Sequence, residues 1–345
     1  MSLIARAGRY ARMPLWAAQL LTGAKSFADN PLLGNPALNQ RGLHVARIRA
    51  GVAMTALRRR AMAYRLSAED LAAYERDGFI VKPSFLPQDH FDELIGQMQA
   101  WRGTVREHIQ GDTVTRLLAL HDKTLERLPA ARRLIDMAEW NDPIQYVGGH
   151  RARPLNYIQT ILTQRHDYGP DPQLALHADT FHSTVKAWLF LHDVADDAAP
   201  FVYVPGSHRM TPERLAWERQ VSIGAATSSC RLTSRGSFRI DEADLPGLGL
   251  PPPRRFAVPA NTLVIADTSG FHARGSSARP TSRVVVWAQA RGNPFLPWFG
   301  PDLWRIGHLG DLREPLYWAL MDRLERAKLG TAHWKEIEDQ PLFAD

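Results

Sequence analysis

The triplet His177-Ala178-Asp179 is the part of the sequence whose residue types are best suited to chemistry. Side chains two apart on an extended segment point to the same side, so the imidazole of His177 and the carboxylate of Asp179 can reach one ion. A third ligand has to come from elsewhere in the chain. His272 is the candidate, because it follows the apolar segment 263–266 and lies in a loop of small residues.

Two histidines and one carboxylate on one face of a metal leave positions open for an organic co-substrate and dioxygen, which is typical of non-haem iron(II) oxygenases. A His-x-Asp triplet alone is weak evidence, because the chain has 13 histidines. Arg283 adds weight, since it opens the apolar segment 283–287, where an inward guanidinium can bind a carboxylate through paired hydrogen bonds. The distal carboxylate of 2-oxoglutarate would explain this charge; a surface ion pair is the alternative.

These residues belong to a longer series of motifs that spans residues 66–295. In order, the series is Leu66-Ser67-Ala68-Glu69-Asp70, Asp77-Gly78-Phe79-Ile80-Val81, the His177 triplet, Val204-Pro205-Gly206-Ser207-His208-Arg209, His272 and Arg283. Its order and spacing resemble the phytanoyl-CoA dioxygenase family of iron(II)/2-oxoglutarate oxygenases. The chain departs from that family's frequent Asn-Gly-Pro-Leu-type stretch at residues 198–201, which read Ala-Ala-Pro-Phe.

The resemblance implies metal ligands at His177, Asp179 and His272, a co-substrate arginine at Arg283, and the use of Fe(II), 2-oxoglutarate and O2. Asp179 favours hydroxylation of an unactivated C–H bond with release of succinate and CO2, because related halogenases have a small residue in place of this carboxylate. Weaker candidates for the co-substrate pocket, for which packing is an equally good explanation, are Gln159, Gln164, Thr180, Lys186 and Trp188. His182 and His208 are interpreted as structural or substrate-facing.

The elements that position these residues are predicted from periodicity and capping. Ser67 as N-cap, acidic residues in the next turn and Gly78 as the stop predict a helix at 68–77. Other helices are expected at 88–101, within 117–147 with breaks at Pro129 and Pro143, and at 316–328. Short β-branched and aromatic runs predict strands at 79–81, 157–162, 185–191, 201–204, 263–266 and 283–289.

The predicted fold is mainly β with flanking helices, with a double-stranded β-helix (jelly-roll, cupin-like) core. We expect a basic helical extension at 1–65, the oxygenase domain with a helical N-terminal part at 66–295, a polar insertion at 210–255, and an aromatic, helical extension at 296–345. The single cysteine, Cys230, excludes an intramolecular disulfide and favours a reducing cytoplasm. No apolar run has the length of a membrane span.

Positive charge is concentrated near the N-terminus, where residues 1–65 hold eleven Arg or Lys and one acidic residue, Asp29. With Trp16 and the Trp- and Phe-rich C-terminal segment, this basic segment suits a small or amphiphilic substrate with an anionic head, such as a lipid, an acyl chain or a lipid-linked sugar. It also suits peripheral contact with an anionic membrane at its inner face. A helix packed on the protein's own body explains residues 2–21 equally well. Nucleic acid is not an expected partner, because the segment lacks a recognised motif and the rest of the chain is not basic.

Two other classes of function compete with the oxygenase. A metal-dependent hydrolase or isomerase on a cupin-like barrel could hold zinc with the same ligands, but it does not explain Arg283. A non-catalytic binding protein could retain the barrel. The intact set of candidate metal ligands argues against this class, because a site without catalytic function would be free to lose them.

Overall fold

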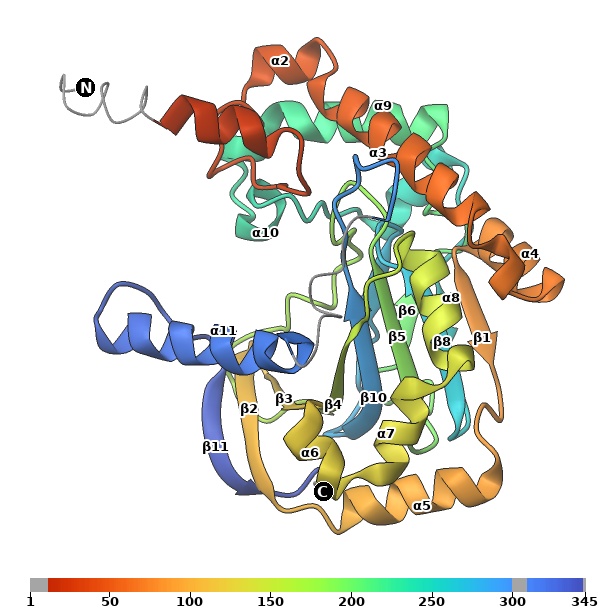
Figure 1. Ribbon diagram of the computed structural model, residues 1–345. Coiled ribbons are helices and arrows are strands. Elements are labelled where there is room, and N and C mark those ends of the chain that lie inside the picture. The colour runs from red at the N-terminus through yellow and green to blue at the C-terminus, as the bar shows by residue number, and fades with distance from the viewer. Residues whose placement is uncertain (1–11, 300–308, 344–345) are drawn as a thin grey trace.

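The computed structural model describes residues 12–299 and 309–343, and two β-sheets form its centre (Figure 1). The larger sheet has the strand order β1-β8-β5-β10-β4-β3-β2-β11, and the smaller sheet has the order β7-β6-β9. The strands are β1 Phe79–Lys82, β2 Gly103–Gln110, β3 Thr113–Ala119, β4 Leu155–Leu162, β5 Val185–Phe190, β6 Phe201–Tyr203, β7 Arg254–Phe256, β8 Thr262–Asp267, β9 His272–Arg274, β10 Ser282–Ala290 and β11 Lys335–Gln340.

The chain alternates between the two sheets from β4 onward. β4, β5, β8 and β10 are neighbours in the larger sheet, whereas β6, β7 and β9 form the smaller one. The segment at His177, between β4 and β5, pairs with β9 through a bridge from His177 to His272. Antiparallel strands that alternate in this way between two sheets make a double-stranded β-helix, so the predicted fold class is confirmed.

Helices cover the outer face of the larger sheet and one end of the barrel (Figure 1). They are α2 Pro36–Gln40, α3 Leu43–Arg60, α4 Ala68–Asp77, α5 Gln88–Gln99, α6 Asp122–Arg127, α7 Pro129–Asp136, α8 Ala138–Gly148, α9 Pro212–Gly224, α10 Arg231–Ser234 and α11 Leu309–Arg326. α8 packs on β5, β8 and β10, and α2 and α3 pack on α9. Among the described residues, no helix has both the length and the apolarity needed to cross a bilayer.

Strand alternation divides the core into an outer and an inner part. On β5, Ala187 and Leu189 join the core beneath the helices, whereas Trp188 and Phe190 join the aromatic core between the two sheets. Phe201 of β6 packs on Trp188 with ring centroids 4.3 Å apart. The barrel interior is therefore a packed, largely apolar space into which a few polar side chains project.

The predicted helix 68–77 and all the predicted strands are present. The helical prediction for 117–147 is wrong at its start, because residues 117–119 end β3, and Pro143 does not break α8. A proline removes only one helical hydrogen bond, and Trp140 and Ile144 bury this helix in the core. β2, β3 and β11 were not predicted. Their residues alternate too little between apolar and polar to indicate strands, and they form strands only because they pair with neighbours in the sheet. The insertion 210–255 is substantially helical, containing α9 and α10.

The basic N-terminal segment packs on the barrel over the part that the structure describes. Arg47 donates hydrogen bonds to the carbonyls of Leu20, Thr22 and Ala24, and Arg59 of α3 forms an ion pair with Asp267 at 3.0 Å. Residues 12–19 are helical, whereas residues 1–11, which include Arg6 and Arg9 of the predicted membrane contact, lie outside the described residues. Part of the charge in this segment is thus used inside the protein.

The loop before His272 makes a close approach that only glycine permits. A Cβ on Gly270 would lie 2.0 Å from Tyr203 Oη and 2.9 Å from Ser207 Oγ. We predict that Gly270→Ala lowers the free energy of unfolding by about 1–3 kcal/mol, as overpacking does in other cores, measured by urea denaturation. Gly247→Ala, whose Cβ would meet nothing within 4 Å, is the matched control and should stay within about 0.5 kcal/mol of the parent. Equal stability of the two variants would contradict the packing described for this loop.

Candidate metal centre

His177 and His272 are held together by their own backbones. The N–H of His177 donates to the carbonyl of His272 at 2.9 Å, and the N–H of His272 donates to the carbonyl of His177 at the same distance. The next residue but one, Asp179, donates its N–H to the carbonyl of Thr268 at 2.8 Å. His272 is the first residue of β9 rather than a loop residue, so regular strand pairing places the two imidazoles side by side.

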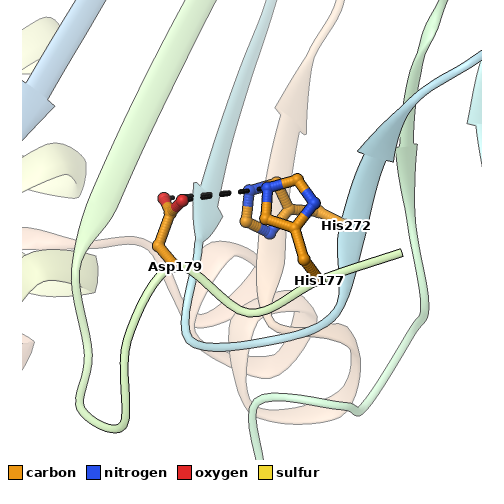
Figure 2. Close-up of side chains that lie close together, drawn as sticks. All are labelled: His177, Asp179 and His272. Carbon is orange, nitrogen blue, oxygen red and sulfur yellow. Dashed lines mark ion pairs between the residues drawn. The ribbon is translucent and has the colours of Figure 1, made fainter. Parts of the chain in front are cut away.

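The side chains of His177, Asp179 and His272 converge on one point (Figure 2). One ligand atom from each lies within 4.8 Å of the others. His177 Nε2 is 3.9 Å from Asp179 Oδ1, and His272 Nε2 is 3.7 Å from Asp179 Oδ2. Both imidazoles are buried and Asp179 is partly open, so the cluster faces solvent on its aspartate side.

Hydrogen bonds on the far side of each ring select the tautomer that can bind a metal. His177 Nδ1 lies 2.8 Å from the carbonyl of Ala175, and His272 Nδ1 lies 3.0 Å from the carbonyl of Gly270. A carbonyl only accepts, so each Nδ1 carries the proton and each Nε2 presents a lone pair to the cluster. His272 Nε2 is buried without a hydrogen-bond partner among the described residues, which fits a metal ligand.

The charges of the cluster suit a cation at neutral pH. Burial, and then the neighbouring His272, hold the pKa of His177 well below its usual range, and burial also lowers the pKa of His272. Burial opposes ionisation of Asp179, but Lys186 and the two histidines outweigh it and hold the pKa of this carboxyl well below its ordinary value. The structure therefore presents two neutral imidazoles and one carboxylate, the protonation states that metal binding requires.

A buried carboxylate, Asp267, holds the segment that carries His272. It accepts hydrogen bonds from Arg59 Nη2 at 3.0 Å, from Tyr74 Oη at 3.0 Å, and from the N–H and hydroxyl of Ser269 at 3.0 and 2.7 Å. Burial disfavours the charged form, but Arg59 outweighs it and lowers the pKa of Asp267. The basic N-terminal segment thus contributes directly to the loop between β8 and β9.

Arg283 enters the barrel from β10 as a buried cation. Only 6% of it is exposed, and it donates a hydrogen bond to the carbonyl of Ala199 at 2.5 Å, whereas its Nε has no partner among the described residues. Burial, and then the nearby Arg274, lower its pKa to about 9. Arg274 is itself paired with Asp171, so the described part of the protein leaves Arg283 without a carboxylate of its own.

The weaker sequence candidates have different surroundings. Lys186 Nζ forms an ion pair with Asp179 Oδ2 at 2.7 Å, and Trp188 belongs to the aromatic core. Thr180 is buried, has no hydrogen-bond partner in the described structure, and faces the pocket that also contains Phe27 and His44. Gln164 is exposed, with a φ of 54°, and donates to the carbonyl of Ser277. The structure thus brings Lys186 to the metal ligands, and it places Gln164 in a surface turn.

The remaining histidine and glutamine candidates are largely buried. Gln159 lies on β4 within the sheet and is 9% exposed. His182 and His208 are also largely buried, and burial lowers their pKa values to about 3 and about 4. The ring of His208 lies against Tyr74 at a tilt, with centroids 5.2 Å apart, next to the Asp267 network, which is consistent with its structural interpretation.

Sequence reasoning missed two residues near the cluster. Lys25 Nζ donates to the backbone carbonyl of Asp179, and Asp267 anchors the second ligand segment. Lys25 lies in a stretch without a motif, so nothing in its neighbourhood indicated this contact. Asp267 could have been suspected, because a charged residue ends the apolar strand 263–266.

A double-stranded β-helix with two histidines and one aspartate at one end is the arrangement of non-haem iron oxygenases. Comparison with known proteins points to the same class. Residues 74–228 match the family model described as phytanoyl-CoA dioxygenase (PhyH), the family that the motifs resemble. The match includes His177 and Asp179, whereas the structure adds His272 and Arg283.

Among curated proteins, the chain is similar to ectoine dioxygenase from Halomonas elongata. The two are 29% identical over 165 residues, which cover 42% of this chain and 47% of that enzyme. The chain therefore spans about half the length of this relative.

Solved structures similar to the chain include a non-haem α-ketoglutarate-dependent epimerase, SnoN, from nogalamycin biosynthesis, which is 21% identical with a TM-score of 0.42 over 64% of this chain and 81% of that one. HygX from Streptomyces hygroscopicus, solved with nickel, 2-oxoglutarate and hygromycin B bound, is 14% identical with a TM-score of 0.41 over 65% and 86%. EctD from S. alaskensis with bound Fe is 17% identical with a TM-score of 0.37 over 65% and 76%.

Removing any one ligand should abolish tight metal binding. We predict that His177→Ala, Asp179→Ala and His272→Ala each weaken binding of Fe(II) more than about hundredfold, because losing a direct ligand costs more than losing a residue that only supports one. Anaerobic equilibrium dialysis with metal analysis measures the effect. His166→Ala, which removes a partly exposed histidine stacked on Tyr168, is the control and should bind like the parent. Parent-like affinity in the His272 variant would remove this residue from the site.

Proposed function

We propose that the protein is an Fe(II)- and 2-oxoglutarate-dependent dioxygenase that hydroxylates an unactivated C–H bond of a small molecule, with release of succinate and CO2. The observation that carries the proposal is the pairing of two features. His177, Asp179 and His272 form a metal-ready cluster, and Arg283 is a buried guanidinium without a carboxylate partner among the described residues. A metal-dependent hydrolase or isomerase would use the first feature and leave the second without a purpose.

The three ligands would hold Fe(II) through two Nε2 atoms and one carboxylate. The metal and its co-substrate supply the oxidising power when bound, and the protein's task is to position and enclose the reacting groups. Arg283 binds the distal carboxylate of 2-oxoglutarate and neutralises a charge that the barrel would otherwise have to solvate. Trp188, Phe201 and Trp287 form the apolar interior that keeps water away.

Lys186 prepares Asp179 for the metal. Its ammonium group lies 2.7 Å from Asp179 Oδ2, and after burial itself it is the largest influence on the pKa of this carboxyl. Before the metal binds, Lys186 keeps the Asp179 carboxylate ionised and oriented. The hydrogen bonds from His177 and His272 to backbone carbonyls do the same for the imidazoles, so the ligands need little rearrangement.

A lipid-like substrate, and peripheral contact of the N-terminal segment with an anionic membrane, are the finer parts of the proposal. Large apolar side chains are exposed in and just after the helical residues 12–19: Met13, Leu15 and Leu21 are 38%, 59% and 71% exposed. The exposed Arg12 lies directly beside them in the sequence. Exposed apolar side chains beside positive charge are suited to an anionic lipid surface.

Replacing Arg283 should weaken co-substrate binding without loss of the metal. We predict that Arg283→Gln raises the Kd for 2-oxoglutarate by about tenfold or more, because a charged, buried pair of hydrogen bonds is lost. Anaerobic calorimetric titration of the Fe(II)-loaded protein gives this value. Arg255→Gln removes an arginine that pairs with Asp196 at the surface and should leave the affinity unchanged. If the parent protein binds no 2-oxoglutarate and forms no succinate, the oxygenase proposal is wrong.

The membrane proposal predicts that the full-length protein sediments with vesicles of phosphatidylglycerol and that added salt reduces the bound fraction. Leu15→Glu with Leu21→Glu should reduce the bound fraction severalfold, because both side chains then resist transfer from water. Leu57→Glu, at a position 50% exposed on α3, is the control. Protein that stays in the supernatant at low salt would contradict a membrane role for residues 1–65.

A further inference from the structure

A cavity of about 370 Å3 lies directly beside Asp179. Its walls come from the N-terminal segment through Lys25, from the segment before β4, from the start of β5 and from the end of β10. Val185, Leu155 and Ala290 provide apolar surface, and Thr184, Thr268 and Gln289 provide polar groups. The volume lies in the range of small-molecule sites, and a molecule there would lie against the proposed metal.

The cavity has a strong excess of positive charge. Its basic lining residues are Lys25, Arg153, Lys186, Arg291 and Arg313, and Asp179 is the one carboxylate among its described lining residues. Arg153 is already paired with Asp136, so the imbalance centres on Lys25, Lys186 and Arg291. Lys186 pairs with the Asp179 carboxylate, and Lys25 donates to the Asp179 backbone carbonyl. Arg291 is exposed and makes no hydrogen bond or ion pair with any residue that the structure describes.

Metal binding increases this imbalance. In the proposed function, Asp179 and one carboxylate of 2-oxoglutarate bind the metal, and their two negative charges only offset the charge of Fe(II). The distal carboxylate of 2-oxoglutarate is matched by Arg283. Lys186 then loses its partner, so Lys25, Lys186 and Arg291 lie around the cavity without an anion among its described lining residues to balance them. Like charges held together in partly buried space repel strongly, so this arrangement favours a negatively charged occupant.

We propose that the substrate carries a carboxylate or phosphate group, which binds in this cavity to Lys25, Lys186 and Arg291. This inference rests on the proposed function, because it identifies the cavity as the place where the substrate meets the metal. Arg291 supplies two parallel donors suited to a planar or tetrahedral oxyanion, and the two lysines supply point charges. The apolar wall receives the carbon skeleton, and the bound anion orients it toward the metal.

The N-terminal segment thereby gains a role in substrate recognition. Lys25 reaches the cavity because Arg47 holds residues 20–24 by three hydrogen bonds to their carbonyls. A purely structural role for Lys25 and Lys186, in which they only support Asp179, would leave Arg291 without a function. Arg291 is therefore the residue that separates the two explanations.

The test measures anion binding to the loaded full-length protein, with nickel(II) as a redox-inactive replacement for iron. Binding of 2-oxoglutarate is measured first, and inorganic phosphate, acetate and neutral acetamide are then titrated calorimetrically. We expect saturable binding of phosphate and acetate but not of acetamide. Arg291→Gln and Lys25→Met should each weaken phosphate binding about tenfold, and Arg291→Lys should restore part of it. Arg60→Gln makes the same charge change at an exposed position on α3 and should have no effect.

A further arm distinguishes a soluble anion from a lipid headgroup. Phosphatidic acid vesicles that bind in an Arg291-dependent manner would place the phosphate on a lipid, and Arg291-dependent binding of free phosphate would place it on a soluble molecule; both support the inference. Protein that binds 2-oxoglutarate but no anion, or that binds anions equally well in the Arg291→Gln and Arg60→Gln variants, overturns it. Failure to bind 2-oxoglutarate at all instead overturns the proposed function.

Discussion

The reciprocal backbone pairing of His177 with His272 is the interaction on which the site depends. It joins the segment before β5 to β9, and it places both imidazoles on one side of the smaller sheet. The same pairing positions Asp179, because it lies two residues after His177 on the same extended segment and its N–H donates to the carbonyl of Thr268. Three nearby features support this pairing. Gly270 allows the close approach to Tyr203, the Asp267 network fixes the loop before His272, and two backbone carbonyls orient the imidazole rings.

The second constraint is that charged groups inside the protein need partners of opposite charge. Asp267 is paired with Arg59, Asp171 with Arg274, and Asp179 with Lys186, so each of these carboxylates has a cation. Arg283 and Arg291 lack such partners among the described residues. A protein tolerates an unmatched cation only where solvent or a ligand compensates it. In the proposed function, 2-oxoglutarate compensates Arg283 within the barrel, and an anionic substrate binds the exposed Arg291 in the cavity beside Asp179.

The N-terminal segment shows that composition alone does not identify the groups that its charges bind. Eleven basic residues with one acid indicated an anionic partner outside the protein. In the structure, Arg47 and Arg59 bind backbone carbonyls and Asp267, and Lys25 donates to the backbone carbonyl of Asp179. Charge patterning cannot distinguish an internal partner from an external one, because it contains no information on which groups the fold brings near.

The sequence by itself predicted the cluster of His177, Asp179 and His272, the buried arginine of β10 and the class of fold. These features are encoded locally: an alternating strand places His177 and Asp179 on one side, a charge in an apolar strand requires a partner, and short β-branched runs form strands. Only the tertiary structure decided that β2, β3 and β11 extend the larger sheet, that His272 starts a strand, and that Lys25, Lys186 and Arg291 share one cavity. These features depend on contacts between residues far apart in the chain, and such contacts have no local pattern to reveal them.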